Sequence, residues 1–229
     1  MKHVTRALAA WLVIVCLASA LQAAESDFKV EELKEAPQGL SAEVQAAINE
    51  TGYRIVGKDG PICDVWLAKE VAMKPGFKSS LRVKYPFLTG ALIGAIRYPE
   101  GTKPNDFRGQ PFQAGTYTLR AGLQPDDGNH LGTSEIRDFL VACPPKADQS
   151  AKRIEKIKDL FKLSAQAAGT THPTIFLLIP PPAKPFEAAA VSHDDEKKLV
   201  IFSVNATGKD KDKTVPIPIS IVTIGKSAG

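Results

Sequence analysis

The stretch PFQAGTYTLRAGLQPDDGNHLGTSEIRDFLVACP, residues 111–144, decides the fold class of this chain. Apolar residues occupy alternate positions in residues 115–123, and a second apolar face follows in residues 138–143. A period of two is typical of strands with one buried face, so we predict a strand in each segment. The turn formers of residues 125–129 predict that the chain reverses between them in a long polar loop. This loop holds the densest cluster of functional side chains in the sequence.

Short strand patterns recur along the rest of the chain. Asp-Gly at residues 59–60 joins residues 53–56 to residues 62–67 and predicts a hairpin, because it supplies the positive φ angles of tight turns. Residues 199–206 and 214–224 predict a final antiparallel pair. We therefore predict a mainly β protein, an antiparallel β-sandwich of roughly eight to ten strands with one amphipathic helix and one short helix. A barrel is the alternative, because many short strands give the same signal for both.

Two helices and one sheet edge have separate signals. Apolar residues three or four apart predict the amphipathic helix over residues 151–168, and a glycine follows its end. Ser41 is suited to cap a short helix over residues 42–48. Pro216 and Pro218 cannot donate ladder hydrogen bonds, so we expect the first half of the last strand to be an edge.

The N-terminus has the three-part layout of a secretory signal peptide. Lys2 and Arg6 supply positive charge, residues 7–18 are apolar, and small residues follow. We predict that residues 1–23 are removed as a leader, and that residues 24–229 form one β-sandwich domain of an exported, periplasmic or secreted protein. An uncleaved membrane anchor is the alternative reading.

The remaining chain has little net charge. Loss of the leader would leave 27 of the 29 basic residues against 25 acidic ones, so the formal net charge would fall from +4 to +2. Nucleic-acid binding would require a basic stripe with interleaved aromatic residues, and we predict no such partner. No later apolar run reaches the length of a membrane span, so none is expected after cleavage. An envelope protein or a glycan is the expected partner.

Two cysteines follow the leader. Cys63 and Cys143 both have the apolar parity of a predicted strand, and an exported protein folds in an oxidising compartment. A disulfide would close a loop of about 80 residues and would stabilise the fold by roughly 4 kcal/mol. Two buried free thiols that pack as small apolar groups are an equally supported alternative. Trp66 has the opposite parity from Cys63, and we expect its face of the sheet to be covered.

The polar loop contains a candidate metal site. Asp127 and His130 offer carboxylate and imidazole ligands, and His172 would complete the site if its loop meets theirs. In the alternative reading, Asp126 and Asp127 bond the backbone of their own turn and His130 packs at the base of the loop.

A candidate binding surface includes the same loop and the strands beside it. It comprises Arg120, Asn129, His130, Arg137 and Asp138. The alternative is structural, because Arg120 could pair with Asp138 across the sheet. The sequence favours neither reading.

No catalytic constellation is recognisable. The nucleophile elbow, the glycine-rich phosphate loop, the HExxH zinc motif and the haem attachment motif do not occur. We therefore assign no catalytic or cofactor-binding residue and leave the identity of any cofactor open, and we favour a noncatalytic binding or accessory protein of the cell envelope. The alternative is a metal-dependent enzyme or a metal-binding protein centred on the loop of Asp127 and His130.

Four segments resemble a known group of sequences. They are CDVWLAKEV (residues 63–71), FLTGALIGAIRYPEG (87–101), GTYTLRAGLQPDDGNHLGTSEIRDFLV (115–141) and SAQAAGTTHPTIFLL (164–178). The chain is similar in these segments to uncharacterised exported β-rich proteins of environmental bacteria such as planctomycetes and acidobacteria. The resemblance covers most of the chain after the leader, and it implies a bacterial envelope location without implying an activity.

Overall fold

Strands are the main regular elements of the described chain. The computed structural model describes residues 27–127, 134–210 and 213–226, and the predicted leader, residues 1–23, lies outside these ranges. The strands in them are β1 (Lys29–Leu33), β2 (Gly52–Gly57), β3 (Gly60–Leu67), β4 (Leu92–Tyr98), β5 (Gly115–Leu123), β6 (Asp138–Cys143), β7 (Thr174–Ile179), β8 (Ala190–Asp194), β9 (Leu199–Asp210) and β10 (Lys213–Ile224). The helices are α1 (Ala42–Ala47) and α2 (Ile157–Ala168). The mainly β class is therefore confirmed.

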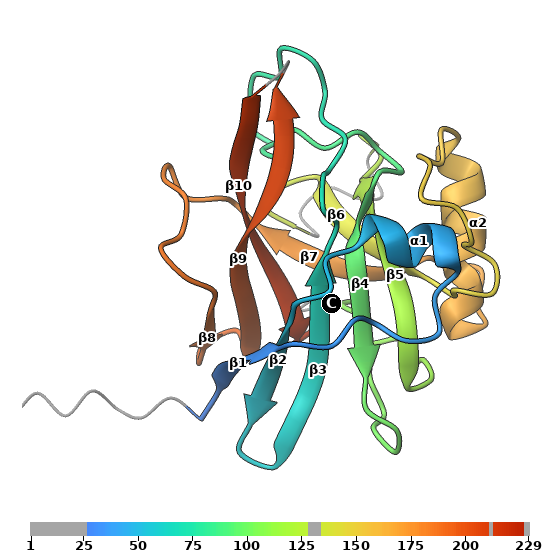
Figure 1. Cartoon of the computed structure of the whole chain (residues 1–229), viewed down its shortest axis with the longest axis vertical. Coiled ribbons are helices and arrows are strands. Elements are labelled where there is room, and N and C mark those ends of the chain that lie inside the picture. The colour runs from blue at the N-terminus through green and yellow to red at the C-terminus, as the bar shows by residue number, and fades with distance from the viewer. Residues whose placement is uncertain (1–26, 128–133, 211–212, 227–229) are drawn as a thin grey trace, which may run out of the picture.

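All ten strands belong to one antiparallel sheet in the order β1-β2-β3-β4-β5-β6-β7-β10-β9-β8. The sheet curves until its two outer strands approach each other, and the rings of Phe28, just before β1, and His193 in β8 lie 5.1 Å apart (Figure 1). The result is a nearly closed, barrel-like sheet. The predicted sandwich is not confirmed, because every strand has a place in one continuous order.

Alternate side chains of the strands point inward and form the main core. Its largest fully buried members include Phe202, Tyr85, Phe176 and Leu119. Burial of each such side chain contributes about 1.5–3 kcal/mol, so the period of two that marks the strands also supplies the core. Two smaller apolar clusters lie on the outer face of the sheet, one beneath α1 and one beneath α2.

The β2–β3 hairpin confirms the prediction from residues 59–60. Gly57 pairs with Gly60, and Gly60 has a φ angle of 118°, which only glycine adopts readily. The register shifts between Ile55 and Val56, as expected for a hairpin turn followed by a bulge. Trp66 is fully buried under the segment that contains α1, and its indole N–H donates to the carbonyl of Glu35 at 2.8 Å. The expected cover over this face is thus present.

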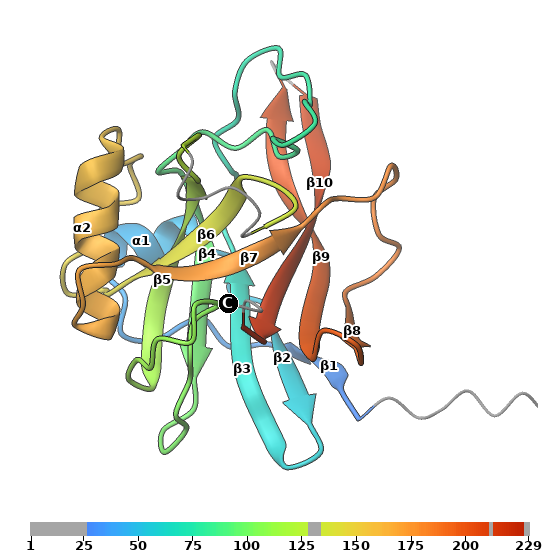
Figure 2. The ribbon, with the colours of Figure 1, turned by 180° about the vertical axis from the view of Figure 1, so that it is seen from behind.

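The short helix begins where the sequence predicts, and the long one does not. Ser41 caps α1 by accepting a hydrogen bond from the N–H of Val44 at 3.2 Å. The predicted start of the second helix at residue 151 is wrong, because α2 begins at Ile157. Both helices lie on the outside of the sheet beside β4, β5 and β6 (Figures 1 and 2). Within the described ranges, neither helix has the length and apolar character needed to cross a bilayer.

The proline positions of β10 lie on a free edge. β10 pairs with β7 only at Ser220 and Ile221, so its earlier residues have β9 as their one strand partner. The N–H of Ser220 donates to the hydroxyl of Tyr85 at 3.3 Å, which shows that even-numbered residues of β10 direct their N–H groups away from β9. Pro216 and Pro218 share this parity and have no N–H to present. The predicted edge is therefore confirmed.

Candidate functional site

The loop between β5 and β6 is fixed to its surroundings at its base. Arg137 donates from Nε to the carbonyl of Gln124 at 2.8 Å and from a terminal nitrogen to Asp126 at 3.2 Å. Arg82 also lies 3.8 Å from Asp126. Asn129 and His130, the centre of both candidate sites, lie outside the described residues. Of the predicted binding surface, Arg137 alone among the described members is more than marginally exposed.

The structure does not bring the described members of the candidate metal site together. Asp127 follows β5, whose last residue pairs with Asp138 at the beginning of β6. His172 precedes β7, whose first residue pairs with Ala142 near the end of β6. The two residues thus lie at opposite ends of a strand that is about 16 Å long at 3.3 Å per residue. No group of three potential metal ligands occurs within residues 27–127, 134–210 and 213–226.

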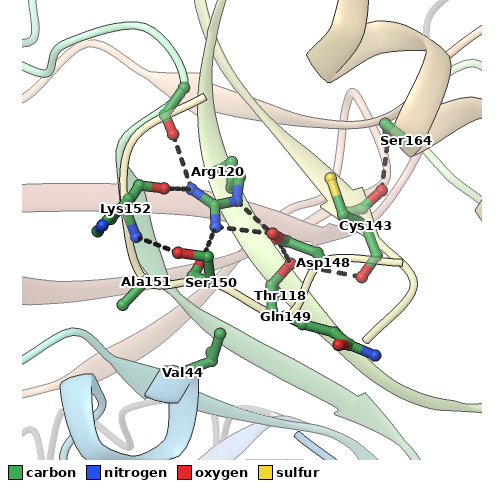
Figure 3. A network of polar contacts seen from close by, with 12 residues as sticks. Val44, Thr118, Arg120, Cys143, Asp148, Gln149, Ser150, Ala151, Lys152 and Ser164 are labelled. Carbon is green, nitrogen blue, oxygen red and sulfur yellow. Dashed lines mark hydrogen bonds and ion pairs between the residues drawn. The ribbon is translucent and has the colours of Figure 1, made fainter. Parts of the chain in front are cut away.

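Arg120 is a structural residue, which corrects its place in the predicted surface. Its side chain is fully buried on the outer face of β5, and Asp148 lies beside it (Figure 3). It donates from Nε and a terminal nitrogen to the two carboxylate oxygens, at 2.5 and 2.7 Å. Its other donors reach the carbonyls of Gly90 and Lys152, both at 2.9 Å, and that of Ser150. All five N–H donors of the guanidinium are therefore used.

The Arg120 network explains why the second helix begins late. Asp148 pairs with Arg120 and also accepts a hydrogen bond from the hydroxyl of Thr118, so it is not a helix cap. The carbonyls of residues 150 and 152 accept from the arginine, and the N–H of Ile154 donates to Gly90 at 3.2 Å. These backbone groups already have hydrogen-bond partners in other segments. A helix that began at residue 151 would have to exchange those hydrogen bonds for helical ones, so the helix begins later.

Asp138 is also in the interior and not on a surface. Its carboxylate accepts backbone hydrogen bonds from Lys84 at 2.6 Å and Tyr85 at 3.4 Å. Burial raises the pKa of Asp138 above its ordinary value of 3.8, and the backbone donors offset part of this effect. The residue thus holds the segment between β3 and β4 against β6. The predicted cross-strand pair with Arg120 does not form, because each residue has its own partners.

The two cysteines lie on opposite faces of the sheet. Cys63 belongs to the main core inside the barrel-like sheet, whereas Cys143 packs outside with Leu160 beneath α2. Both are free thiols with no exposed surface. Of the two readings of the cysteines, this structure has the free thiols, because side chains on opposite faces of a sheet cannot bring their sulfur atoms together.

A wide groove lies where β7 and β10 separate. The two strands pair only through Ile179 with Ser220 and Leu178 with Ile221, and β7 then runs across the sheet away from β10 (Figure 2). The groove has a volume of about 1360 Å³. It lies between β7, the end of β10, the β2–β3 and β8–β9 turns and the connection from β4 to β5.

Side chains close the strand edges that the separation exposes. Asp106 is fully buried and accepts hydrogen bonds from the backbone N–H of Ile175 in β7 and from the backbone N–H of Arg108 and Gln110. At the end of β10, the hydroxyl of Tyr98 donates to the carbonyl of Thr223 at 3.3 Å. Because these backbone groups are satisfied, the groove is a built feature of the surface and not an unfinished sheet edge.

The groove combines an apolar floor with charges of both signs. Partly exposed apolar residues in its lining are Phe28, Ile62, Phe107, Leu177 and Ile224. Charged residues around it are Asp27, Lys58, Asp59, Lys103, Glu135, Glu196, Lys197, Lys198 and Lys226. Ile224 is 40% exposed, which is unusual for a large apolar side chain at the end of a strand.

The lining of the groove offers several kinds of contact to a ligand. No histidine or cysteine occurs among its described residues. Burial raises the pKa of the Tyr98 phenol well above its ordinary value, so this group remains neutral at physiological pH. The groove thus offers apolar contact, hydrogen bonds and salt bridges.

Comparison of the chain with protein-family models, with curated proteins and with solved structures finds no match in any of the three. The resemblance to exported proteins of environmental bacteria therefore stays a prediction. What the groove can bind must be inferred from its own residues.

Sequence patterns locate the parts of the groove without showing that they converge. Its rim comes from turns at residues 58–60, 102–109 and 195–198, and each of these segments is recognisable by its turn formers. The separation of β7 from β10 brings these turns together, and no local pattern encodes it.

Proposed function

We propose that this protein is an exported, noncatalytic binding protein of the cell envelope, and that the groove between β7 and β10 holds a segment of a partner protein. The observation that carries the proposal is the groove itself, with about 1360 Å³ of space above partly exposed apolar side chains. Small-molecule pockets usually have roughly 300–1,000 Å³. A larger, open groove is better suited to a segment of a polymer.

Two features favour a peptide over a glycan. Glycan sites typically present the open face of an aromatic ring, whereas two of the three rings that line this groove, those of Phe28 and Tyr98, contact other rings. Phe28 contacts His193 at 5.1 Å, and Tyr98 is buried against Phe112 at 5.3 Å. The rim has lysines beside carboxylates, which matches the mixed charges of a peptide better than the uniform surface of a neutral sugar chain.

Site-specific photo-crosslinking tests this proposal. A benzophenone amino acid replaces Lys103 or Lys197 at the rim, and Lys162 on the exposed side of α2 in the matched control. After irradiation in cells, we expect a discrete protein adduct from both rim positions and none from the control. The same adducts should disappear in the Ile224→Asp background, because the new carboxylate would charge the apolar floor.

Two outcomes would count against the proposal. Equal crosslinking from Lys162 and from the rim would show that the adducts do not report on the groove. Adducts that resist protease but are released by glycan hydrolysis would assign the groove to the other partner class. Circular dichroism of Ile224→Asp controls for loss of fold.

A further inference from the structure

The connection between β3 and β4 carries the most exposed large apolar side chain of the described residues. Leu81 is 86% exposed, whereas the groove residue Ile224 is 40% exposed. Figures 1 and 2 place this connection at the end of the molecule opposite the β2–β3 turn. Leu81 belongs to this connection and is not among the residues that line the groove described above.

Leu81 is held outward by a closed turn. The N–H of Ser80 donates to the carbonyl of Val83 at 2.9 Å, and the N–H of Val83 donates to the hydroxyl of Ser80 at 3.1 Å. The turn is tied to the body of the protein, because the carbonyl of Arg82 accepts from the N–H of Arg137 at 2.7 Å and Asp138 accepts from Lys84. The protrusion of the leucine is thus part of the fold.

The surroundings of Leu81 are basic. Residues 71–99 contain no aspartate or glutamate. The basic residues of this segment that lie nearest to Leu81 follow one another at spacings of two to four residues, and they are Lys74, Lys78, Arg82 and Lys84. Lys74 lies over the ring of Phe77, 5.5 Å from its centre, which keeps an aromatic side chain within the basic segment. Asp126 lies 3.8 Å from Arg82 and also pairs with Arg137. The segment therefore combines one exposed apolar side chain, Leu81, with several basic residues close to it in the chain.

We propose that the tip formed by residues 74–84 binds the surface of an anionic lipid bilayer, with Leu81 entering the headgroup boundary and the basic side chains contacting lipid phosphates. A pocket of about 400 Å³ lies beside the tip and is lined in part by Lys74, Phe77 and Lys84, but Leu81 is not among its lining residues and projects into solvent. The exposed leucine and the neighbouring basic residues match the requirements of interfacial binding, which are a small apolar insertion and juxtaposed cations. The proposal is independent of the groove and would orient it relative to the membrane.

Vesicle co-sedimentation of the protein purified after export tests the proposal. The probes are vesicles of phosphatidylcholine alone and vesicles with 30% phosphatidylglycerol. We expect binding to the anionic vesicles only and a marked loss of binding in high salt, because surface attraction is screened. Leu81→Asp should weaken the binding by about tenfold or more, since one change removes the insertion and adds repulsion.

A second basic surface provides the matched control. Lys158 and Lys162 lie on the exposed side of α2, and the double change Lys158→Gln/Lys162→Gln removes two charges away from the tip. Lys78→Gln/Arg82→Gln removes two charges at the tip and should reduce binding severalfold, while the α2 variant should bind as the unchanged protein does. All variants carry the same N-terminus, so any retained leader affects each equally.

Three results would overturn the proposal. One is absence of binding to anionic vesicles at low salt, which would leave an acidic protein as the partner of the tip. Another is unchanged binding by Leu81→Asp that circular dichroism shows to be folded. The third is loss of binding in the α2 variant alone, which would assign the membrane contact to the helix.

Discussion

Two clusters of arginine and aspartate hold the outer face of the sheet, and they differ in how far water reaches them. In one, Arg120 and Asp148 are 0% and 4% exposed. In the other, Asp64 is 1% exposed, but its partners Arg54 and Arg97 are 30% and 24% exposed. Removal of a partner from a buried pair leaves an uncompensated charge, whereas a solvated partner can be replaced by water.

The clusters also differ in what they connect. Arg120 binds three backbone carbonyls, and through them it fixes residues 144–156, which have no regular structure, to β5. Asp64 joins side chains of three adjacent strands, because Arg54 is on β2 and Arg97 on β4. Hydrogen bonds of the sheet already hold those strands together. The first cluster therefore determines local structure, and the second reinforces a structure that exists without it.

The largest effect is expected from Arg120→Ala. This change leaves Asp148 buried without its cation and three carbonyls without a donor, so the free energy of unfolding should fall by roughly 3–5 kcal/mol. Denaturant unfolding followed by circular dichroism measures the effect. Arg120→Met combined with Asp148→Leu should recover part of the loss, and a double variant no more stable than Arg120→Ala would show that the carbonyl contacts dominate.

Arg54→Ala is the matched change in the exposed cluster. Asp64 keeps the contacts of Arg97 at 2.6 and 2.9 Å, so we expect a loss of about 1 kcal/mol or less by the same unfolding assay. The comparison would fail if Arg54→Ala and Arg120→Ala destabilised the protein equally.

Asp138 extends the comparison to a buried carboxylate that is bound by N–H groups of the backbone. Its pKa is raised in the folded protein by burial, so the folded state binds the proton more tightly than the unfolded state does. The contribution of Asp138 to stability is therefore greatest below the ordinary carboxyl pKa and declines as the pH rises through the raised pKa. Asp138→Asn should remove this decline. Unfolding free energies of both proteins, measured from acidic to neutral pH, would contradict the assignment if they stayed parallel.

The smallest effect is expected at the cysteines, because Cys63 inside the sheet and Cys143 beneath α2 are both buried without a charged partner in a salt bridge. Burial raises the pKa of both thiols, so little reactive thiolate is present. A thiol reagent should label neither Cys63 nor Cys143 in the folded protein and both after denaturation without reductant, as peptide mapping will show. A reductant should leave the melting temperature unchanged. Labelling that requires reductant would reveal a bridge between chains or a different fold.

The sequence predicts those features that depend on local periodicity. The β2–β3 hairpin, the α1 cap and the edge position of Pro216 and Pro218 each follow from the conformational limits of a few residues. The sequence also predicts which face of the strand Arg120 occupies, because its position alternates with the apolar positions of Tyr117 and Leu119. The sequence does not predict that residues 144–156 cover Arg120 on the outer face of β5, because this segment has no periodic pattern that would link it to the strand.

The near closure of the sheet and the presence of the groove both depend on contacts between residues that are far apart in the sequence. Nothing in the pattern of β10 shows that it pairs with β7 for only two residues, and this short pairing creates the groove. The faces assigned to Cys63 and Cys143 likewise depend on how the sheet curves. The sequence predicts that both positions are buried, but they are buried in different apolar clusters. Cys63 lies inside the sheet, and Cys143 lies beneath α2.

The two prolines of β10 affect how copies of this protein behave toward one another. Identical chains can meet while their strands assemble, and a bare strand edge with free N–H groups would recruit them into fibres. The imino nitrogens of Pro216 and Pro218 interrupt that row of donors without disturbing the side bonded to β9. The part of β10 that precedes its pairing with β7 can thus remain open without acting as a template for aggregation.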